Sequence, residues 1–386
     1  MQNPADTREV YITRIDSHAM PHRVPQSQTI DWLQWAVSKS SAPEDAQPDA
    51  IAFLDRLREN SAIASRGSVL RDFSAARFDH LTLFANGTES VADAALEARM
   101  HHHAVAANTI ARELFPDDIA PDTVFNVTCT GYDSPNPVQR MLSARGWTNT
   151  KHYQIGHMGC YAAFPALRLA EAHVRSGASS TADILHTELC TLHFRPADTR
   201  REQLVVQTLF ADGAVRLHCR GDAGTGSALR ILGHDEVLLQ GTEEDMTWHL
   251  SEQGFFMTLS RAVPVHLRGA VEKAVGAFLR RRGMTLDDVM QVAIHPGGPR
   301  IIDTIAELLD LEEDRIAHSR AVLSDHGNMS SATVPHIWKR MLEDDSIPDG
   351  AIVLSMAFGP GLTLVMNLME KTVHGNAPSG RGNGNA

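Results

Sequence analysis

Strand-like and helix-like stretches alternate along this chain, and that alternation constrains its fold more than any other feature. Short apolar runs, several of them rich in β-branched residues, are typical of buried strands, and they occupy 123–130, 182–194, 288–296 and 351–369. Helical apolar spacing marks 138–147, 271–283 and 299–311. We also expect residues 213–219 and 227–234 to form paired strands around the turn "RGDAGTG". Elements that alternate in this way favour an α/β fold with central sheets.

Composition excludes several classes of function. The 386 residues carry a formal net charge of −12, which argues against a nucleic-acid-binding protein, because phosphate contact needs clustered Lys and Arg. The N-terminus lacks the apolar core of a signal peptide, and no run approaches the roughly 18 apolar residues of a membrane span. These features predict a cytoplasmic protein with no membrane partner.

The cysteines and histidines do not indicate a metal site. The four cysteines, at 129, 160, 190 and 219, form no CxxC pair or zinc-like cluster. They are expected to be reduced thiols, as in the cytosol. His101, His102 and His103, with Arg99 nearby, are interpreted as the polar face of a helix.

Three residues have the chemistry and the placement of catalytic groups. Cys160, His295 and Asn328 each lie at an expected element end beside glycine, where catalytic side chains often lie. A helix N-terminus and a nearby imidazolium favour a thiolate, so Cys160 could attack an acyl thioester and hold the acyl group. His295 Nε2–H and the Asn328 amide could then donate to the oxygen of a thioester enolate. Taken singly, each residue could instead be structural.

A set of motifs resembles the type III polyketide synthases, the chalcone synthase family of the thiolase superfamily, in their bacterial form. "YQIGHMGCYAAFPALRLAEAH" resembles the family's nucleophile segment, "LFADGAVRL" its "LFGDGA" segment, and "IHPGGPRIID" its histidine loop. "HGNMSSATV" resembles the asparagine loop, and "AFGPGLTLVM" the C-terminal "GFGPG" signature. "SAIASRGSVL" and "VTCTGYDSPNP" resemble an N-terminal segment and the loop before the nucleophile. These motifs follow one another in the family's order.

The resemblance implies a five-layered, thiolase-like α-β-α-β-α fold and a homodimer. The two similar halves would be 8–222, which carries the cysteine, and 223–373, which carries the histidine and asparagine; residues 374–386 would be a flexible tail. Cys160 would carry the starter and the growing chain, and His295 and Asn328 would drive decarboxylation. Phe210 would be the gatekeeper of the cavity. The other implied substrate-binding residues are Arg66, Ser134, Cys190, Gly297, Gly298, Gly359, Pro360 and Gly361.

The implied activity is that of an acyltransferase that extends an acyl starter with malonyl units by decarboxylative Claisen condensation, with cyclisation as a possible last step. The substrates would be acyl-CoA and malonyl-CoA, with no cofactor and no metal. Cationic residues for coenzyme A are sparse, with Arg66 and Arg300 as candidates, so an acyl carrier protein is an alternative partner. A single-condensation enzyme similar to β-ketoacyl carrier-protein synthase III is the nearest alternative function. A second alternative is a non-catalytic acyl-binding protein. The presence of Cys160, His295 and Asn328 together argues against it.

Pro165 departs from the expected helix after Cys160. A proline in a helix interior removes a hydrogen-bond donor and costs about 3 kcal/mol. The helix is therefore expected to begin close to Pro165, with some effect on the geometry at Cys160.

Overall fold

The structure is a computed structural model, and it describes residues 8–87, 89–260 and 262–374. His374 ends the last strand, so most of the predicted tail, residues 375–386, lies outside the described residues. Within the described part, no helix combines the length and the apolar character needed to span a membrane.

A nine-stranded sheet runs through the molecule in the order β13-β14-β15-β10-β1-β9-β8-β6-β7. It consists of two half-sheets that join where β1 meets β10, at the pairs Tyr11↔Arg230 and Ile12↔Leu229. Parallel pairing joins β6 to β7 and β8, and β13 to β14, while the other neighbours are antiparallel. The strands are β1 (Tyr11–His18), β6 (Thr123–Thr128), β7 (Lys151–Gly156), β8 (Thr181–Leu189), β9 (Asp212–Arg220), β10 (Gly226–Leu238), β13 (Gln291–Ile294), β14 (Ile352–Gly359) and β15 (Thr363–His374).

Two helices lie between the half-sheets. α5 (Ala163–Arg175) and α10 (Thr333–Glu343) share one apolar core with the inner faces of both half-sheets. Strand alternation separates this core from the outer ones: in β14, Val353 and Ala357 face the central helices, while Leu354 and Met356 face outward.

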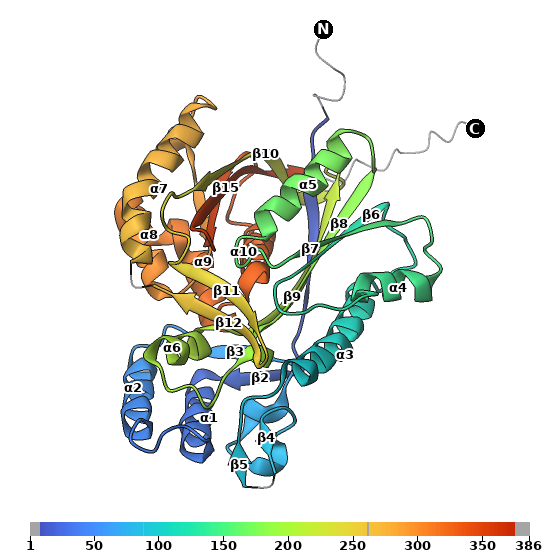
Figure 1. Ribbon diagram of the computed structural model, residues 1–386. Coiled ribbons are helices and arrows are strands. Elements are labelled where there is room, and N and C mark those ends of the chain that lie inside the picture. The colour runs from blue at the N-terminus through green and yellow to red at the C-terminus, as the bar shows by residue number, and fades with distance from the viewer. Residues whose placement is uncertain (1–7, 88, 261, 375–386) are drawn as a thin grey trace, which may run out of the picture.

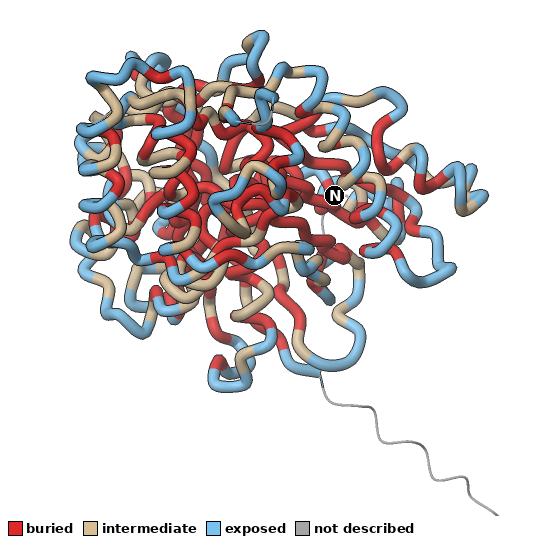
Figure 2. The backbone as a smooth tube through the Cα atoms, turned by 90° about the horizontal axis from the view of Figure 1, so that it is seen from below, coloured by how far each residue is buried: buried red, intermediate tan, exposed pale blue. Residues whose placement is uncertain are grey.

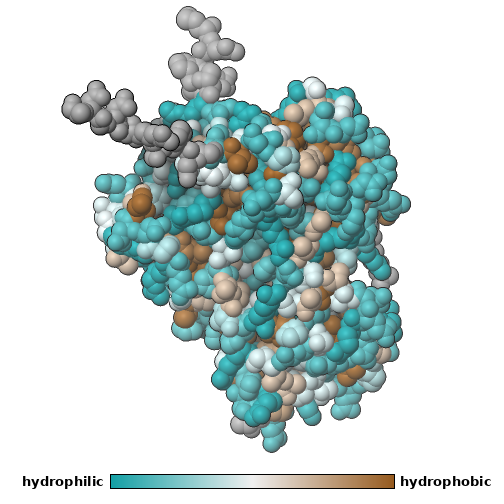
Figure 3. All heavy atoms as spheres, turned by 180° about the vertical axis from the view of Figure 1, so that it is seen from behind, coloured by the Kyte–Doolittle hydropathy of each residue, from teal (hydrophilic) through white to brown (hydrophobic). Residues whose placement is uncertain are grey.

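Further helices cover the outer faces and complete five layers (Figure 1). On the N-terminal half, α3 (Leu96–Leu114) and α4 (Pro137–Arg145) cover the sheet, while α1 (Gln26–Lys39), α2 (Gln47–Glu59) and α6 (Arg201–Leu209) pack on one another below it (Figure 1). On the C-terminal half they are α7 (Val263–Arg280), α8 (Pro299–Leu309) and α9 (Glu313–His326). Figure 2 shows the result, with buried backbone through the middle of the molecule and exposed loops around it. The face in Figure 3 is mostly hydrophilic, with small scattered apolar patches.

Three short two-stranded sheets complete the described fold. They are β2 (His22–Pro25) with β3 (Ser65–Ser68), β4 (Ala85–Asn86) with β5 (Ser90–Val91), and β11 (Met246–Ser251) with β12 (Gly254–Leu259). Short 3-10 turns cover Arg71–Ser74, Phe78–His80, Cys190–His193, Leu286–Asp288 and Ser330–Ala332.

The structure corrects two expectations. The strands predicted to pair around "RGDAGTG", β9 and β10, do not pair with each other, because β1 lies between them and bonds to both. Arg99 and His103 are buried rather than on a polar helix face: the Arg99 guanidinium donates to the carbonyls of Ala94 and Phe194, and His103 packs against Gly131. The predicted boundary at 222/223 falls in the connection between β9 and β10 and stays a prediction.

Candidate active site

Cys160 lies in the loop that joins β7 to α5, three residues before the helix begins. This loop approaches the C-terminal half so closely that a Cβ on Gly159 would lie 2.7 Å from the Pro360 ring. Pro165 is the third residue of α5. Its missing N–H belongs to the first turn, where backbone donors have no partner inside the helix, so the proline costs no helical hydrogen bond.

The asparagine loop supplies the polar neighbours of Cys160. Asn328 Oδ1 accepts the Ser330 N–H at 2.9 Å, and the Thr333 hydroxyl, 3.4 Å from that oxygen, donates to Ser330 O at 2.9 Å instead. With its oxygen held in this way, the amide N–H group of Asn328 is left to donate toward the Cys160 thiol. The backbone of Asn328 is held in turn by the N-terminal half, since its N–H donates to Leu209 O and its carbonyl accepts the Ala211 N–H.

His295 follows β13, and among the described residues no hydrogen bond links its ring to Cys160. Its backbone N–H donates to Met356 O at 2.9 Å. The ring is buried, and among the described residues neither ring nitrogen has a hydrogen-bond partner. A buried histidine without partners is free to donate one hydrogen bond to an incoming group.

Burial holds both groups in their neutral forms. It raises the pKa of the Cys160 thiol to about 12, although hydrogen bonds from Ser330 and Asn328 oppose the shift. It lowers the pKa of His295 to about 3. The thiolate–imidazolium pair expected from the sequence is therefore disfavoured in the unliganded protein.

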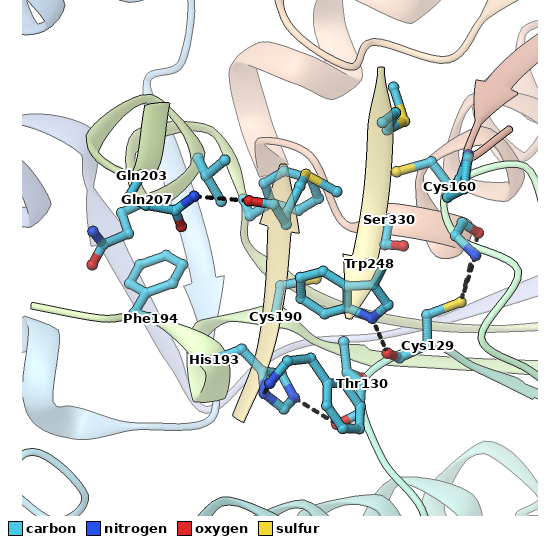
Figure 4. Close-up of a pocket in the computed structure, with 17 residues that line it drawn as sticks. Cys129, Thr130, Cys160, Cys190, His193, Phe194, Gln203, Gln207, Trp248 and Ser330 are labelled. Atoms are coloured by element: carbon cyan, nitrogen blue, oxygen red, sulfur yellow. Dashed lines mark hydrogen bonds between the residues drawn. The ribbon is translucent and has the colours of Figure 1, made fainter. Parts of the chain in front are cut away.

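A small cavity of about 30 Å³ opens beside Cys160. That volume has room for one or two water molecules, so a substrate can enter only if side chains move. Figure 4 shows side chains from both halves around it. The lining residues are Cys129, Thr130, Gly159, Cys160, Cys190, His193, Phe194, Gln203, Val206, Gln207, Phe210, Met246, Trp248, Phe255, Met257, Ser330 and Pro360.

The β11–β12 hairpin closes one side of this cavity. The Trp248 indole N–H donates to Cys129 O at 2.7 Å, and the Phe255 N–H donates to His193 Nδ1 at 3.1 Å. The ring of Phe255 stacks on that of His193 with centroids 4.5 Å apart. These contacts fix the hairpin against the loop after β6 and the turn after β8.

The predicted substrate-binding residues divide into two groups. Cys190, Phe210 and Pro360 line the cavity. The glycines shape its surroundings instead: a Cβ on Gly359 would overlap the Tyr161 ring, and one on Gly298 would lie 3.4 Å from Leu209. Gly297 precedes Gly298 in the histidine loop, and Gly361, with φ +113°, turns the chain from β14 into β15.

Arg66 and Ser134 do not lie where residues that bind a substrate in this cavity would be expected. Arg66 is buried, and its guanidinium donates to the carbonyls of Gln207 and Phe210 at 2.7 and 2.5 Å. It therefore holds the backbone behind Phe210 and presents no charge to solvent. Ser134 is exposed in the loop before α4, and the described cavity lining does not include it.

Sequence reasoning missed Glu188, which is fully buried two residues before Cys190. Its carboxylate accepts the Cys129 N–H at 2.9 Å and the hydroxyls of Thr130 and Ser331. Burial raises the pKa of Glu188 to about 7. An acidic residue inside the apolar run "ILHTELC" was the available signal, because unpaired carboxylates are rarely buried. Trp248 was missed as well, and no motif marked it.

Comparison with known proteins gives a consistent result. Residues 232–373 match the family model described as chalcone and stilbene synthases, C-terminal domain. The 1,3,6,8-tetrahydroxynaphthalene synthase of Streptomyces coelicolor is 29% identical over 66% of this chain and 67% of its own length. A putative chalcone synthase of Bacillus subtilis is 27% identical over 69% of this chain and 76% of its own.

Solved structures have the same fold over nearly the whole chain. PKS-I of the brown alga Ectocarpus siliculosus superposes with a TM-score of 0.81, at 22% identity, over 94% of this chain and 98% of its own. The tetrahydroxynaphthalene synthase of Streptomyces coelicolor, described as a bacterial type III polyketide synthase, gives 0.79 at 24% identity, over 95% and 100%.

The layered sheets and their structural neighbours define a thiolase-like fold. Within that fold, the family model over residues 232–373 and the relatives at 27–29% identity support a type III polyketide synthase, chalcone synthase-like and of bacterial type. They favour this enzyme over the single-condensation alternative.

Proposed function

We propose that the protein is an iterative condensing enzyme in which Cys160 carries the acyl chain. The thiol attacks an acyl-CoA starter and releases coenzyme A. Malonyl-CoA then loses CO₂, and the resulting enolate oxygen accepts hydrogen bonds from Asn328 and His295. The enolate carbon attacks the Cys160 thioester, which lengthens the chain by two carbons, and cyclisation ends the sequence.

One observation carries this proposal: hydrogen bonding from the Asn328 side chain lowers the pKa of the Cys160 thiol, so the amide lies within reach of the sulfur, while its oxygen accepts the Ser330 N–H. An amide held this way donates without reorganising when charge develops, which is how preorganised donors accelerate a reaction. His295, buried with both ring nitrogens unpaired in the described structure, is the second donor.

We infer that the substrates are CoA thioesters and that no cofactor takes part. Arg300, exposed beside the glycines of the histidine loop at the start of α8, is the candidate group for a CoA phosphate. Arg66 does not serve this purpose, because its guanidinium is buried. An acyl carrier protein as donor is the alternative, and a side-by-side assay with both thioesters distinguishes them.

We also propose that the protein is a homodimer, formed where β7 ends the nine-stranded sheet. Lys151, His152, Tyr153 and Gln154 of this strand are exposed. An uncovered edge strand presents unpaired backbone groups, and pairing with a second copy satisfies them. The four free cysteines are in keeping with a reducing, cytoplasmic location.

The test is to find where the acyl group goes. Incubation with a panel of acyl-CoA starters, followed by peptide mapping, should place the acyl mass on Cys160, and added malonyl-CoA should give longer products by mass spectrometry. Cys160→Ala should lose acylation and condensation. Cys190→Ala, a matched change at another thiol of the same cavity, should still be acylated. Acylation confined to Cys129 or Cys190 would contradict the proposal.

A further inference from the structure

Three aromatic side chains form one block against the cavity beside Cys160. They are His193, Trp248 and Phe255, and all three line the cavity (Figure 4). The rings of His193 and Phe255 are stacked, with centroids 4.5 Å apart and an interplanar angle of 6°. Trp248 packs edge-on against both, with its centroid 5.8 Å from each. None of the three rings can therefore rotate without displacing the other two.

Both nitrogens of the His193 ring are engaged in hydrogen bonds. Nε2 lies 2.7 Å from Thr130 O, and because a carbonyl oxygen only accepts, Nε2 carries the ring hydrogen. Nδ1 is then the acceptor for the Phe255 N–H at 3.1 Å. Burial lowers the pKa of His193 to about 3, so the ring is neutral near pH 7 and keeps both bonds.

Trp248 is held through its indole and through its backbone. The indole N–H donates to Cys129 O at 2.7 Å, and His157 Nε2 donates to Trp248 O at 2.8 Å. His157 lies three residues before Cys160, so the aromatic block is attached to the nucleophile loop itself. A growing chain could displace the block only by breaking several hydrogen bonds, each of which contributes about 0.5–1.5 kcal/mol.

Other parts of the cavity lining are adaptable. Met246 and Met257 also line the cavity, and packing alone holds their side chains. A methionine side chain is unbranched and changes shape readily. The cavity measures about 30 Å³, whereas a cavity of about 150 Å³ holds one benzene ring. Moving both methionines outward clears room for about one six-membered ring, but a second ring would have to displace the aromatic block.

The number of extensions also decides how a product can leave. After one extension, an enol oxygen that attacked the thioester carbon would close a strained four-membered ring. After two extensions, the enol oxygen of the original starter carbonyl closes a six-membered ring on the thioester carbon. The new C–O bond replaces the C–S bond, and the sulfur leaves with the electron pair and takes up the enol proton. This release needs no water, oxidant or further co-substrate.

Closing a carbon ring from the same chain is less favourable. It requires removal of a proton from the starter's own α-carbon, which only one carbonyl activates, whereas the enol comes from a carbon between two carbonyls. Among the described residues that line the cavity, none carries a carboxylate. The one imidazole in that lining, His193, has no free nitrogen to act as a base.

We propose that this enzyme takes a small aliphatic acyl starter, extends it with two malonyl units and releases the chain as a six-membered lactone. The inference rests on the proposed function and names the substrate and product of the same site. The starter has to share the enlarged cavity with both added units, which excludes aromatic and long-chain acyl groups.

The test is to count malonyl units for starters of different size. The wild-type protein is incubated with ¹³C-labelled malonyl-CoA and with acetyl-, butyryl-, benzoyl- or lauroyl-CoA, and mass spectrometry counts the labelled units in each product. Acetyl- and butyryl-CoA should give products with two units. Benzoyl- and lauroyl-CoA should be turned over about 10-fold more slowly or worse. With deuterated acetyl-CoA, the lactone should retain all the deuterium of the starter, whereas closure of a carbon ring removes some of it.

Two variants of the β11–β12 hairpin separate the fixed wall from the adaptable one. Phe255→Ala removes one ring of the aromatic block and keeps the backbone N–H that donates to His193, so the main product should gain at least one malonyl unit. Met246→Ala is the matched change on the adaptable side. It should speed starter loading, because less has to move, and leave the count at two. Thermal unfolding of both variants checks that the fold survives.

Several results would overturn this inference and leave the proposed function intact. These are a main product from acetyl-CoA with any other number of malonyl units, equal turnover of acetyl- and lauroyl-CoA, loss of starter deuterium, or the same unit count in Phe255→Ala as in the wild type. If the wild-type protein neither becomes acylated at Cys160 nor extends any starter, the proposed function fails and the inference fails with it.

Discussion

Cys160, the proposed nucleophile, lies in a place that suppresses thiolate formation. Its thiol is almost fully buried, and burial outweighs the hydrogen bonds from Ser330 and Asn328 that favour the charged form. Its pKa is therefore raised, and the fraction of thiolate at neutral pH is smaller than for a free cysteine.

This argument predicts the pH dependence of alkylation. In the unliganded protein, the rate of iodoacetamide labelling at Cys160, followed by peptide mapping, should rise with pH through pH 9 without levelling off. His295→Gln should have the same profile, because the neutral His295 forms no ion pair with the thiol. An inflection between pH 5 and 7 in the wild-type protein alone would show that the pair forms despite burial.

The orientation of Asn328 leads to a second prediction. Asn328→Ala should slow malonyl-CoA decarboxylation by roughly 10² to 10³, because one donor to the enolate oxygen is lost. Starter loading on Cys160, measured on the same preparation, should survive and serves as the internal control. If both steps are lost together, the Asn328 loop has misfolded and its assignment as an enolate donor is unsupported.

Among the elements, the β11–β12 hairpin has the most direct effect on the cavity. Its strands pair only with each other among the described strands, and contacts at both strands hold it over the site. Trp248 fills space on the cavity side, and its indole is tied to Cys129 O. The hairpin thus limits the room for a growing chain.

Trp248→Ala should therefore shift the products toward more malonyl units, since removing the indole enlarges the cavity. Mass spectrometry of the products from one fixed starter measures the shift. Leu250→Ala is the matched control, because this exposed residue follows Trp248 on the same strand and should leave the product pattern unchanged. An unchanged pattern in Trp248→Ala would mean that other side chains set the length.

The sequence predicted the helices and strands themselves better than it predicted which of them lie next to one another. Apolar runs and glycine or proline at their ends marked β6, β8, β13, α4, α8 and the β14–β15 hairpin, and the structure confirms them. The position of β1 between β9 and β10 was not predictable, because strand order depends on contacts some 200 residues apart. The inward-facing Arg99, Arg66 and Glu188 were missed for a similar reason: their partners are backbone or side-chain groups from distant segments.

At the scale of the whole molecule, the nine-stranded sheet has two different ends. β13 forms one end, and β7, next to the Cys160 loop, forms the other with four exposed residues. A dimer through β7 would bring two active sites close to one interface. The core of each subunit is already complete, so separating the subunits need not unfold them.

Tyr153→Glu should therefore convert the dimer to a monomer, because it places two like charges near each other across the paired edges. Light scattering measures the mass, and thermal unfolding checks that the fold survives. Val265→Glu adds the same charge at an exposed site on α7 and should leave the dimer intact. A wild-type protein that is itself monomeric at micromolar concentration would contradict the proposed assembly.

The backbone bonds that tie Asn328 to Leu209 and Ala211 also have a consequence for synthesis on the ribosome. The Cys160 loop and the Phe210 segment emerge early, but Asn328, which pairs with the backbone on either side of Phe210, follows more than 100 positions later. Until that late segment docks, the nascent chain has a thiol without its enolate donors. Under the proposed function, the polypeptide therefore becomes able to decarboxylate malonyl-CoA only after this segment has been made, and a product truncated before Asn328 should show no decarboxylation.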